Sequence, residues 1–305
     1  MKLFPSRCRN SLLAHALAIT VMSISLAASF SRTAAAEDFD PTAVAMDKAL
    51  AAALPTDIAS RGVLVVGSDT TYPPAEFLGG ADGVTPDGID VDLAKAISRK
   101  LGLRLDFATA QFDAILPAIG PKYDLGISAF TITKDRYQAV NFVSYFNAGK
   151  QWAVQAGNPV HFNPSDVCGK TVGVQTGSTS EKLVRQMSTD CTSAGKAPVS
   201  IVSMAKQTDL ITRLINGAID AAFNGSTNIG YAVKQTNGQL QTIGEITSPS
   251  PNGIAVAKSD IKWAELVAKA VNELIADGTY GRILSKWGVQ SAAVKQAEVN
   301  PSVDE

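Results

Sequence analysis

After about Thr56, short apolar runs alternate with segments of helical periodicity, and this alternation most restricts the fold of the chain. Residues 63–67 predict a buried strand, and apolar residues recur every four positions from Ile89 to Leu101, the pattern of a helix face. That helix is expected to begin near Asp90 and to end at Gly102. A strand at 103–107, a short helix at 112–119 and a strand at 125–128 follow. This βαβ order predicts a parallel sheet with helices on both faces.

The same alternation restarts further along, and a chain of 305 residues favours two domains. Further strands are expected at 152–155, 172–175, 199–202, 219–223 and 253–257. Helices are expected from 178 and at 208–215, 226–234, 263–275 and 278–287. The last residues, 291–305, are polar and are expected to form a flexible tail.

The first 36 residues have the pattern of a secretory signal peptide. Lys2, Arg7 and Arg9 precede the apolar stretch 12–30, and three alanines at 34–36 form a small-residue cleavage site. We expect cleavage after Ala36, export to the periplasm and a lead-in segment at 37–56 before the fold. A retained membrane anchor is the alternative, because the apolar stretch is long.

The charge of the mature chain argues against two classes of partner. Removal of the signal leaves 23 basic and 28 acidic residues, a net charge of −5. That balance disfavours nucleic acid and anionic membrane surfaces as partners.

Two cysteines remain after cleavage, Cys168 and Cys191. An even number in an exported protein predicts a disulfide, with two free buried thiols as the alternative. The mature chain keeps only His161 among its histidines, so no metal site and no cofactor are expected.

The segment 128–136 places an arginine where a helix is expected to begin. Thr133 is a suitable N-cap, which puts Lys134, Asp135 and Arg136 in the first turn. A cation there opposes the helix dipole by roughly 0.3–1 kcal/mol, unless an anion binds between the guanidinium and free backbone N–H groups. The alternative is a surface arginine that pairs with Asp135 or is solvated.

Three other polar or aromatic positions follow strands, at the edge where open parallel sheets bind ligands. Segment 68–74 presents Tyr72 beside two prolines, and Phe112 begins the next short helix. Segment 175–181 holds Ser178 and Glu181 as a capping box behind Gly177, which permits close backbone approach. Taken singly, these are also a proline turn, a core phenylalanine and a capped helix.

Six motifs occur together in order. They are Asp-x-x-Tyr-Pro-Pro (69–74), Gly-Ile-Asp-Val-Asp-Leu-Ala (88–94), Phe-Asp-x-x-x-Pro-Ala (112–118), Tyr-Asp-Leu-Gly-Ile-Ser-x-x-Thr-Ile-Thr-x-x-Arg (123–136), Lys-Thr-Val-Gly-Val-Gln-x-Gly-Ser-Thr (170–179) and Asp-Gly-Thr-Tyr-x-x-Ile-x-x-Lys-Trp (277–287). Through them the chain resembles periplasmic solute-binding proteins of polar-amino-acid ABC importers (bacterial extracellular solute-binding proteins, family 3), over nearly all of 57–289.

The resemblance implies a two-lobed α/β fold of the periplasmic-binding-protein type II class, with two hinge crossovers. Lobe 1 would comprise 57–148 and 250–290, and lobe 2 would comprise 149–249. The crossings would lie near 147–149 and 248–252, and the lobes would close on a ligand by hinge motion. The expected partners are a small carboxylate ligand and a membrane permease, and the protein is expected to be a monomer.

The resemblance also implies the ligand-binding residues. Arg136 would clamp the α-carboxylate with the N–H groups of Thr131 and Thr179, and Tyr72 and Phe112 would sandwich the side chain. Groups around Ala129 and Thr131 would bind the ammonium, and Asp69 would meet the amine or a polar side chain. The full set of expected positions is Asp69, Tyr72, Phe112, Ser128, Ala129, Thr131, Arg136, Gly177, Ser178, Thr179, Asn224 and Gly225.

Gly225 departs from the family pattern, because many members carry there the acid that binds the ligand's ammonium. An ammonium buried without a counter-charge costs several kcal/mol. Either Asp69 or Asn224 compensates, or the ligand is not a standard α-amino acid.

Two other functions are less consistent with the sequence. A periplasmic dehydratase resembling the cyclohexadienyl type needs a general acid or base in the cleft, but His161 lies outside the matched motifs and position 225 lacks an acid. No transmembrane or signalling segment follows Val289, which disfavours a sensory ectodomain. We therefore expect a binding protein rather than an enzyme.

Overall fold

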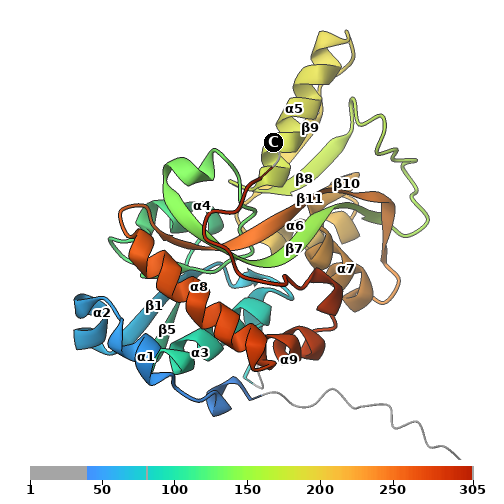
Figure 1. Cartoon of the computed structure of the whole chain (residues 1–305). Helices are drawn as coiled ribbons and strands as arrows, with labels where there is room; N and C mark the ends of the chain where they lie inside the picture. The colour runs from blue at the N-terminus through green and yellow to red at the C-terminus, as the bar shows by residue number, and fades with distance from the viewer. Residues whose placement is uncertain (1–39, 80–81, 304–305) are drawn as a thin grey trace, which may run out of the picture. The chain divides into compact units, whose positions relative to one another are not determined.

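A computed structural model describes residues 40–79 and 82–303 (Figure 1). The expected signal peptide and its cleavage site lie outside these residues. The described part of the lead-in contains η1 (Pro41–Ala43) and α1 (Lys48–Ala52). Asp47 caps α1, and its backbone N–H donates to the Lys100 carbonyl (2.9 Å), so the lead-in packs against lobe 1.

The main sheet has eight strands in the order β5-β1-β6-β11-β7-β10-β8-β9. Their bounds are β1 (Val63–Ser68), β5 (Arg104–Thr109), β6 (Leu125–Gly126), β7 (Val140–Gln155), β8 (Thr171–Gln175), β9 (Ser200–Met204), β10 (Ala221–Gly225) and β11 (Leu240–Ala257). The parallel pairs β1–β5, β1–β6, β8–β9 and β8–β10 match the expectation from the sequence. The sheet as a whole is mixed rather than parallel, because β7 and β11 run antiparallel to their neighbours.

A second, three-stranded sheet was not expected from the sequence. It consists of β2 (Thr71–Tyr72), β3 (Glu76–Gly79) and β4 (Thr85–Asp87), paired antiparallel. These strands are short, and only β3 exceeds three residues. Their alternation of apolar and polar positions is therefore too brief to be recognised in the sequence.

β7 and β11 are the two strands that connect the lobes. They pair antiparallel over almost their whole lengths, from Val140 opposite Ala257 to Gln155 opposite Leu240. The pairing is interrupted by register shifts between Ile243 and Gly253 in β11. Each crossover is thus the middle part of a long strand. The sequence had predicted only one end of each strand, 152–155 in β7 and 253–257 in β11.

The helices cover the sheet much as the periodicity predicts. They are α2 (Thr56–Arg61), α3 (Ile89–Lys100), α4 (Phe112–Ile115), η2 (Leu116–Ala118), α5 (Thr179–Ser193), α6 (Gln207–Ile215), α7 (Ser226–Gln235), α8 (Ile261–Ala276) and α9 (Thr279–Lys286), with one-turn helices η3 (Arg136–Gln138) and η4 (Gln290–Ala292). In Figure 1, α8 and α9 from the end of the chain lie beside α1 and α3 from its beginning.

The buried apolar residues form four clusters, and each cluster belongs to one lobe. Two clusters draw their residues from 44–148 and 254–303, and the other two draw theirs from 152–243. The described core therefore divides between 148 and 152 and between 243 and 254, and the hinge crossings stay a prediction.

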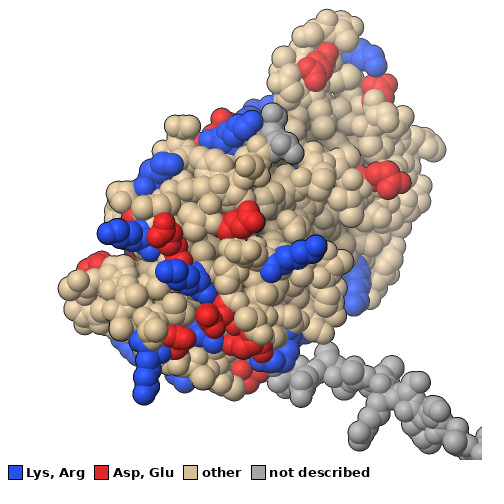
Figure 2. Space-filling view, viewed as in Figure 1, with Lys and Arg blue, Asp and Glu red and all other residues tan. Residues whose placement is uncertain are grey.

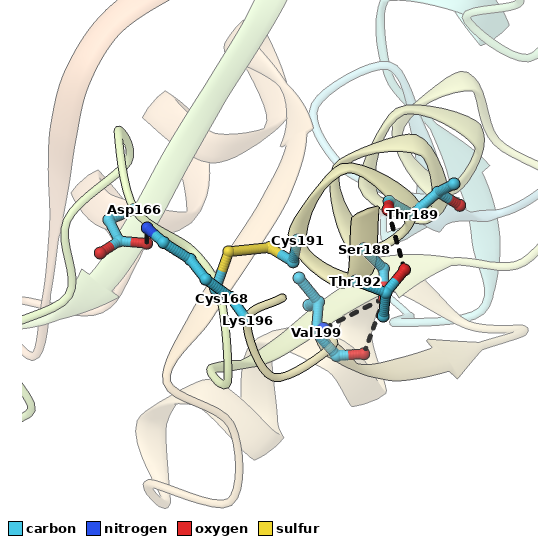
Figure 3. Close-up of a disulfide and its surroundings, with 8 residues drawn as sticks. All are labelled: Asp166, Cys168, Ser188, Thr189, Cys191, Thr192, Lys196 and Val199. Carbon is cyan, nitrogen blue, oxygen red and sulfur yellow. Dashed lines mark hydrogen bonds and ion pairs between the residues drawn. A yellow bond between two sulfur atoms is a disulfide. The ribbon is translucent and has the colours of Figure 1, made fainter. Parts of the chain in front are cut away.

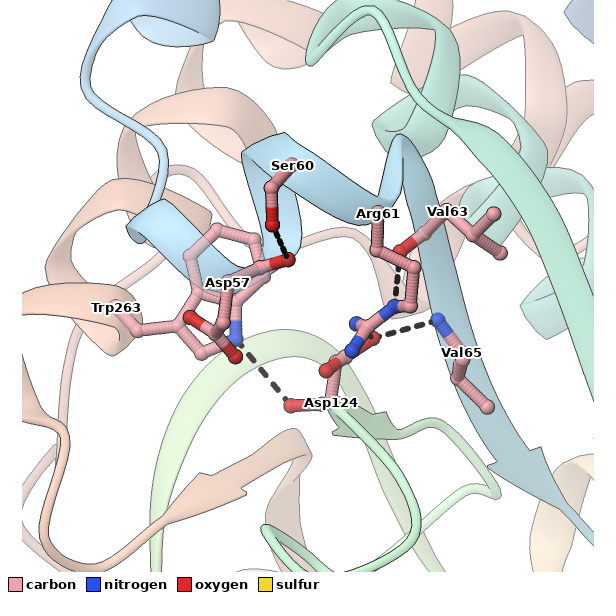
Figure 4. Close-up of polar contacts among 7 residues, drawn as sticks. All are labelled: Asp57, Ser60, Arg61, Val63, Val65, Asp124 and Trp263. Atoms are coloured by element: carbon pink, nitrogen blue, oxygen red, sulfur yellow. Dashed lines mark hydrogen bonds and ion pairs between the residues drawn. The ribbon is translucent and has the colours of Figure 1, made fainter.

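Asp124 joins three elements of lobe 1 (Figure 4). Its Oδ2 accepts a hydrogen bond from the Val65 N–H of β1 (2.8 Å) and pairs with Arg61 of α2 (2.5 Å). The Asp124 carbonyl accepts from Trp263 Nε1 of α8 (3.2 Å). Residues distant in sequence thereby fix both helices against β1.

The disulfide between Cys168 and Cys191 is present (Figure 3). It links the loop before β8 to the last turn of α5, with 5.6 Å between the Cα atoms. Cys191 is buried in the core of lobe 2, and Cys168 packs against the same cluster.

The expectation of a flexible tail is wrong for residues 291–303. Ala297 is buried, and its N–H donates to Asn272 of α8 (2.8 Å). Asn300 Oδ1 accepts from the Phe142 N–H of β7 (2.9 Å), and Val299 forms a β-bridge with Val143. This segment has few apolar residues to bury, but backbone hydrogen bonds hold it along β7.

Acidic and basic side chains lie next to one another over the face that carries α2 and α8 (Figure 2).

Within the part of the chain that the structure describes, no helix has the length and hydropathy needed to cross a membrane. The same residues contain no group of three His, Cys, Asp or Glu side chains that could hold a metal ion.

Candidate ligand-binding site

A pocket of about 280 Å³, including space open to solvent, lies between residues of both lobes. Its lining is Tyr72, Phe112, Ser128, Ala129, Thr131 and Arg136 from lobe 1, and Lys150, Gln175, Ser178, Thr179 and Asn224 from lobe 2. Nine of the expected ligand-binding positions are among these residues. The other three do not line it: Asp69 and Gly177 accept hydrogen bonds from the lining residues Gln175 and Arg136, and Gly225 lines a second pocket.

Arg136 reaches the pocket from a different local structure than the sequence predicted. Thr133 Oγ1 accepts a hydrogen bond from the Arg136 N–H (3.2 Å), as an N-cap would, but only the 3₁₀ turn Arg136–Gln138 follows. The expected helix is absent because the chain enters β7 at Val140. The argument from a helix dipole therefore does not apply to Arg136.

The guanidinium of Arg136 is held by contacts from both lobes. Nη1 donates to the Thr131 carbonyl (2.8 Å), and Nη2 donates to the Gly177 carbonyl of lobe 2 (3.2 Å). The group lies over the rings of Phe112 (5.5 Å) and Phe130 (5.6 Å), a cation–π arrangement. Burial lowers the pKa of Arg136 to about 10, so the group stays charged at neutral pH.

Tyr72 spans the cleft and explains the glycine at position 225. Its hydroxyl donates to Asn224 Oδ1 (2.9 Å) and accepts from the Gly225 N–H (3.2 Å). A Cβ atom at position 225 would lie 2.6 Å from Tyr72 Oη. The tyrosine in this position and an acidic side chain at 225 therefore exclude one another.

Asp69 is turned away from the pocket. Its Oδ1 accepts from Thr71 Oγ1 (2.9 Å), and its Oδ2 accepts from Gln175 Nε2 of lobe 2 (2.5 Å). Burial raises the pKa of Asp69 to about 6. In this structure Asp69 orients the pocket residue Gln175, and a direct contact between Asp69 and a ligand stays a prediction.

The turn before α5 is arranged as the capping box predicts, with one difference. Ser178 Oγ accepts from the Glu181 N–H (3.1 Å), whereas the Glu181 carboxylate accepts from the Gly177 N–H (2.8 Å) rather than from that of Ser178. Thr179 Oγ1 lies 3.3 Å from Thr131 Oγ1 across the cleft. Gly177 has φ +73°, and a Cβ there would lie 2.7 Å from Cβ of Asp113 in lobe 1.

The loop after β6 is supported from behind by two buried carboxyl groups. Ser128 Oγ donates to Glu76 Oε1 (2.7 Å), so this hydroxyl is already engaged inside the protein. Ala129 has φ +45°, and its N–H donates to Asp90 Oδ2 (2.8 Å). Burial raises the pKa of both carboxyl groups, and the neighbouring charge of Asp90 raises that of Glu76 further.

Lys150 and Gln175 line the pocket but were not expected there. Lys150 Nζ donates to Thr131 Oγ1 (3.3 Å), and burial together with the nearby charge of Arg136 lowers the pKa of Lys150 to about 7. A lysine within a run of buried strand residues was the signal in the sequence that could have identified it.

A larger pocket of about 520 Å³, again including open space, adjoins the first. The two pockets share Tyr72, Ala129, Thr131 and Lys150. The larger one extends past Gly225 toward the crossover strands, where Ser248 and Asn252 line it, and Asp90 and Asn228 are also in its wall.

Two α/β lobes joined by two strands, with a half-buried guanidinium in a pocket that both lobes line, define a solute-binding protein of the two-lobed type. The chain belongs to the bacterial extracellular solute-binding proteins, family 3, whose model matches residues 64–290.

Its relatives include proteins that bind amino acids. The chain is 32% identical over 252 residues to an arginine-binding protein of Corynebacterium glutamicum, with 82% of each chain covered. It is 38% identical to the solved structure of an ancestral arginine-binding protein bound to arginine (TM-score 0.68, 74% of this chain and 98% of that chain). It is 27% identical to an ancestral amino acid-binding protein that is a precursor of cyclohexadienyl dehydratase (TM-score 0.68, 76% and 97%).

Proposed function

We propose that this protein is the substrate-binding component of an ABC importer and that it binds an amino acid or a related small polar carboxylate. The single observation that carries the proposal is the Arg136 guanidinium, fixed by both lobes in a pocket between them. A planar guanidinium binds a carboxylate with two parallel hydrogen bonds, which gives both affinity and orientation. The family membership and the amino-acid-binding relatives support it.

Binding in this proposal is coupled to closure of the lobes. Arg136 of lobe 1 and Thr179 of lobe 2 contact the same ligand group only when the cleft is closed. The bonds of Tyr72 to Asn224 and of Asn228 to the Pro73 carbonyl (2.7 Å) also cross the cleft. A ligand that adds contacts to both lobes shifts the equilibrium toward this closed form, which a permease would recognise.

The compartment and processing belong to the same proposal. The chain is exported to the periplasm, the signal peptide is cleaved after Ala36, and the mature protein acts as a monomer. The hinge crossings lie near 147–149 and 248–252.

The alternative of a dehydratase is less consistent with the site. The relatives described above are named as binding proteins. The Asp69 carboxyl is engaged by Thr71 and Gln175 and does not line the pocket. Incubation with prephenate and arogenate, followed by chromatography, tests this alternative, and turnover of either compound would establish an enzyme.

The binding function is tested by calorimetric titration of the wild type with a panel of amino acids and small carboxylates. We expect Arg136→Ala to abolish measurable binding and Arg136→Lys to weaken it, because an ammonium cannot form the paired hydrogen bonds of the guanidinium. The matched control is Arg104→Ala, which removes an exposed arginine of lobe 1. Unchanged affinity in Arg136→Ala would refute the role of Arg136 and with it the proposal.

A further inference from the structure

Lys150 is a buried lysine at the junction of the two pockets. It lies on β7 directly after the first crossover, lines both pockets and is only 8% exposed. Its Nζ donates a hydrogen bond to the Thr131 hydroxyl (3.3 Å). Arg136 donates to the carbonyl of the same residue, so two basic side chains flank Thr131.

Within the described residues, no carboxylate lies at ion-pair distance from Lys150. Asp69 is bound by Thr71 and Gln175. Asp90 lines the larger pocket, but its oxygens accept from the Tyr145 hydroxyl (2.7 Å) and the Ala129 N–H (2.8 Å). The charged group near Lys150 is the guanidinium of Arg136, which repels the positive charge of a protonated Lys150.

Burial of a charge without a partner costs free energy, because the charge loses its hydration. Only an opposite charge and hydrogen bonds offset that loss. A ligand with a single carboxylate satisfies Arg136 and leaves Lys150 unpaired. A ligand with a cationic side chain would add a further positive charge to a pocket that already holds two basic side chains.

We infer that the ligand carries a second anionic group, which Lys150 binds where the two pockets meet. This inference rests on the proposed function, in which Arg136 binds the first carboxylate. The ligand class is therefore a small dicarboxylate, such as an acidic amino acid, rather than the arginine bound by relatives. The larger pocket, which Lys150 also lines, provides room for the second group.

The test compares acids with their amides, which have nearly the same shape but differ in charge. Wild-type protein is titrated calorimetrically with L-aspartate and L-asparagine, L-glutamate and L-glutamine, and with L-arginine. We expect at least one acid to bind about 10- to 100-fold more tightly than its amide, the range expected for a hydrogen bond between charged groups.

Three variants identify the group that recognises the charge. Lys150→Met should remove the preference for the acid while amide binding is retained, and Lys150→Arg should keep the preference. Lys134→Met removes an exposed lysine of lobe 1 and should behave as wild type. Melting curves without ligand show whether each variant is folded.

The outcomes separate this inference from the proposed function. If an amide or L-arginine binds best and the binding depends on Arg136, the proposed function stands and the inference is overturned. An acid preference that persists in Lys150→Met also overturns it. Binding that is independent of Arg136 instead refutes the proposed function itself.

Discussion

Replacement of Gly177 by alanine should weaken ligand binding by preventing full closure of the lobes. Gly177 lies at the start of the turn before α5, and its added Cβ would stand 2.7 Å from Cβ of Asp113 in the opposite lobe. Ordinary contacts between such atoms begin at about 3.4 Å, so the lobes would have to separate by up to an ångström. Overpacking of this kind costs about 1–3 kcal/mol. Because that cost arises only in the closed form, the dissociation constant should rise about 5- to 150-fold.

Gly195→Ala is a close control. Gly195 is also in lobe 2, its φ of +72° matches the +73° of Gly177, and nothing lies within 4 Å of its added Cβ. Both variants should therefore lose about 1–2 kcal/mol of lobe 2 stability from the left-handed backbone alone. Only Gly177→Ala should bind more weakly.

The assay is calorimetric titration with the amino acid that binds wild type most tightly, together with urea unfolding of the ligand-free proteins. In a double-mutant cycle, Asp113→Gly should restore much of the affinity lost in Gly177→Ala, because it removes the opposing Cβ atom. Equal weakening in Gly177→Ala and Gly195→Ala, or wild-type affinity in Gly177→Ala, would contradict the closure argument.

Two further predictions concern stability. Replacing Cys168 and Cys191 by alanine opens a loop of 23 residues and should lower the free energy of unfolding of lobe 2 by about 3 kcal/mol. Urea titration measures this change, and an unchanged midpoint of unfolding would contradict the stabilising role of the disulfide. Burial raises the pKa of Asp69 from 3.8 to about 6, so its stabilising contribution is complete below pH 3.8 and is lost as the pH rises through 6. Asp69→Asn should flatten the pH dependence of the unfolding free energy in that window, and a slope equal to that of wild type would show that Asp69 does not cause it.

Much of the fold could be predicted because its helices and strands have clear periodicity. The alternating pattern identified β1, α3, β5 and most elements of lobe 2 within a few residues. Nine residues of the smaller pocket were among those that the family resemblance implied, eight of them inside the quoted motifs. The order of residues along the chain contains no distances across the cleft.

The errors have physical causes at particular residues. The helix expected after Thr133 is one 3₁₀ turn because β7 begins at Val140, a long-range pairing that local capping signals do not contain. Lys150 was overlooked because the crossover strand was expected to begin only at Trp152. The tyrosine at position 72 explains Gly225, and no local pattern connects residues that lie 153 positions apart.

The division of lobe 1 between two distant stretches of sequence has a consequence for the order of folding. As the chain is synthesised, all of lobe 2 emerges before the second half of β11, α8 and α9. Until then β6 lacks its antiparallel neighbour, and the apolar side of α3 lacks the helices that cover it. A chain interrupted near residue 250 would therefore contain one lobe able to fold and one half-lobe with an open strand edge, a source of aggregation. We expect lobe 2 to fold first, and lobe 1 to form last from the two ends of the chain.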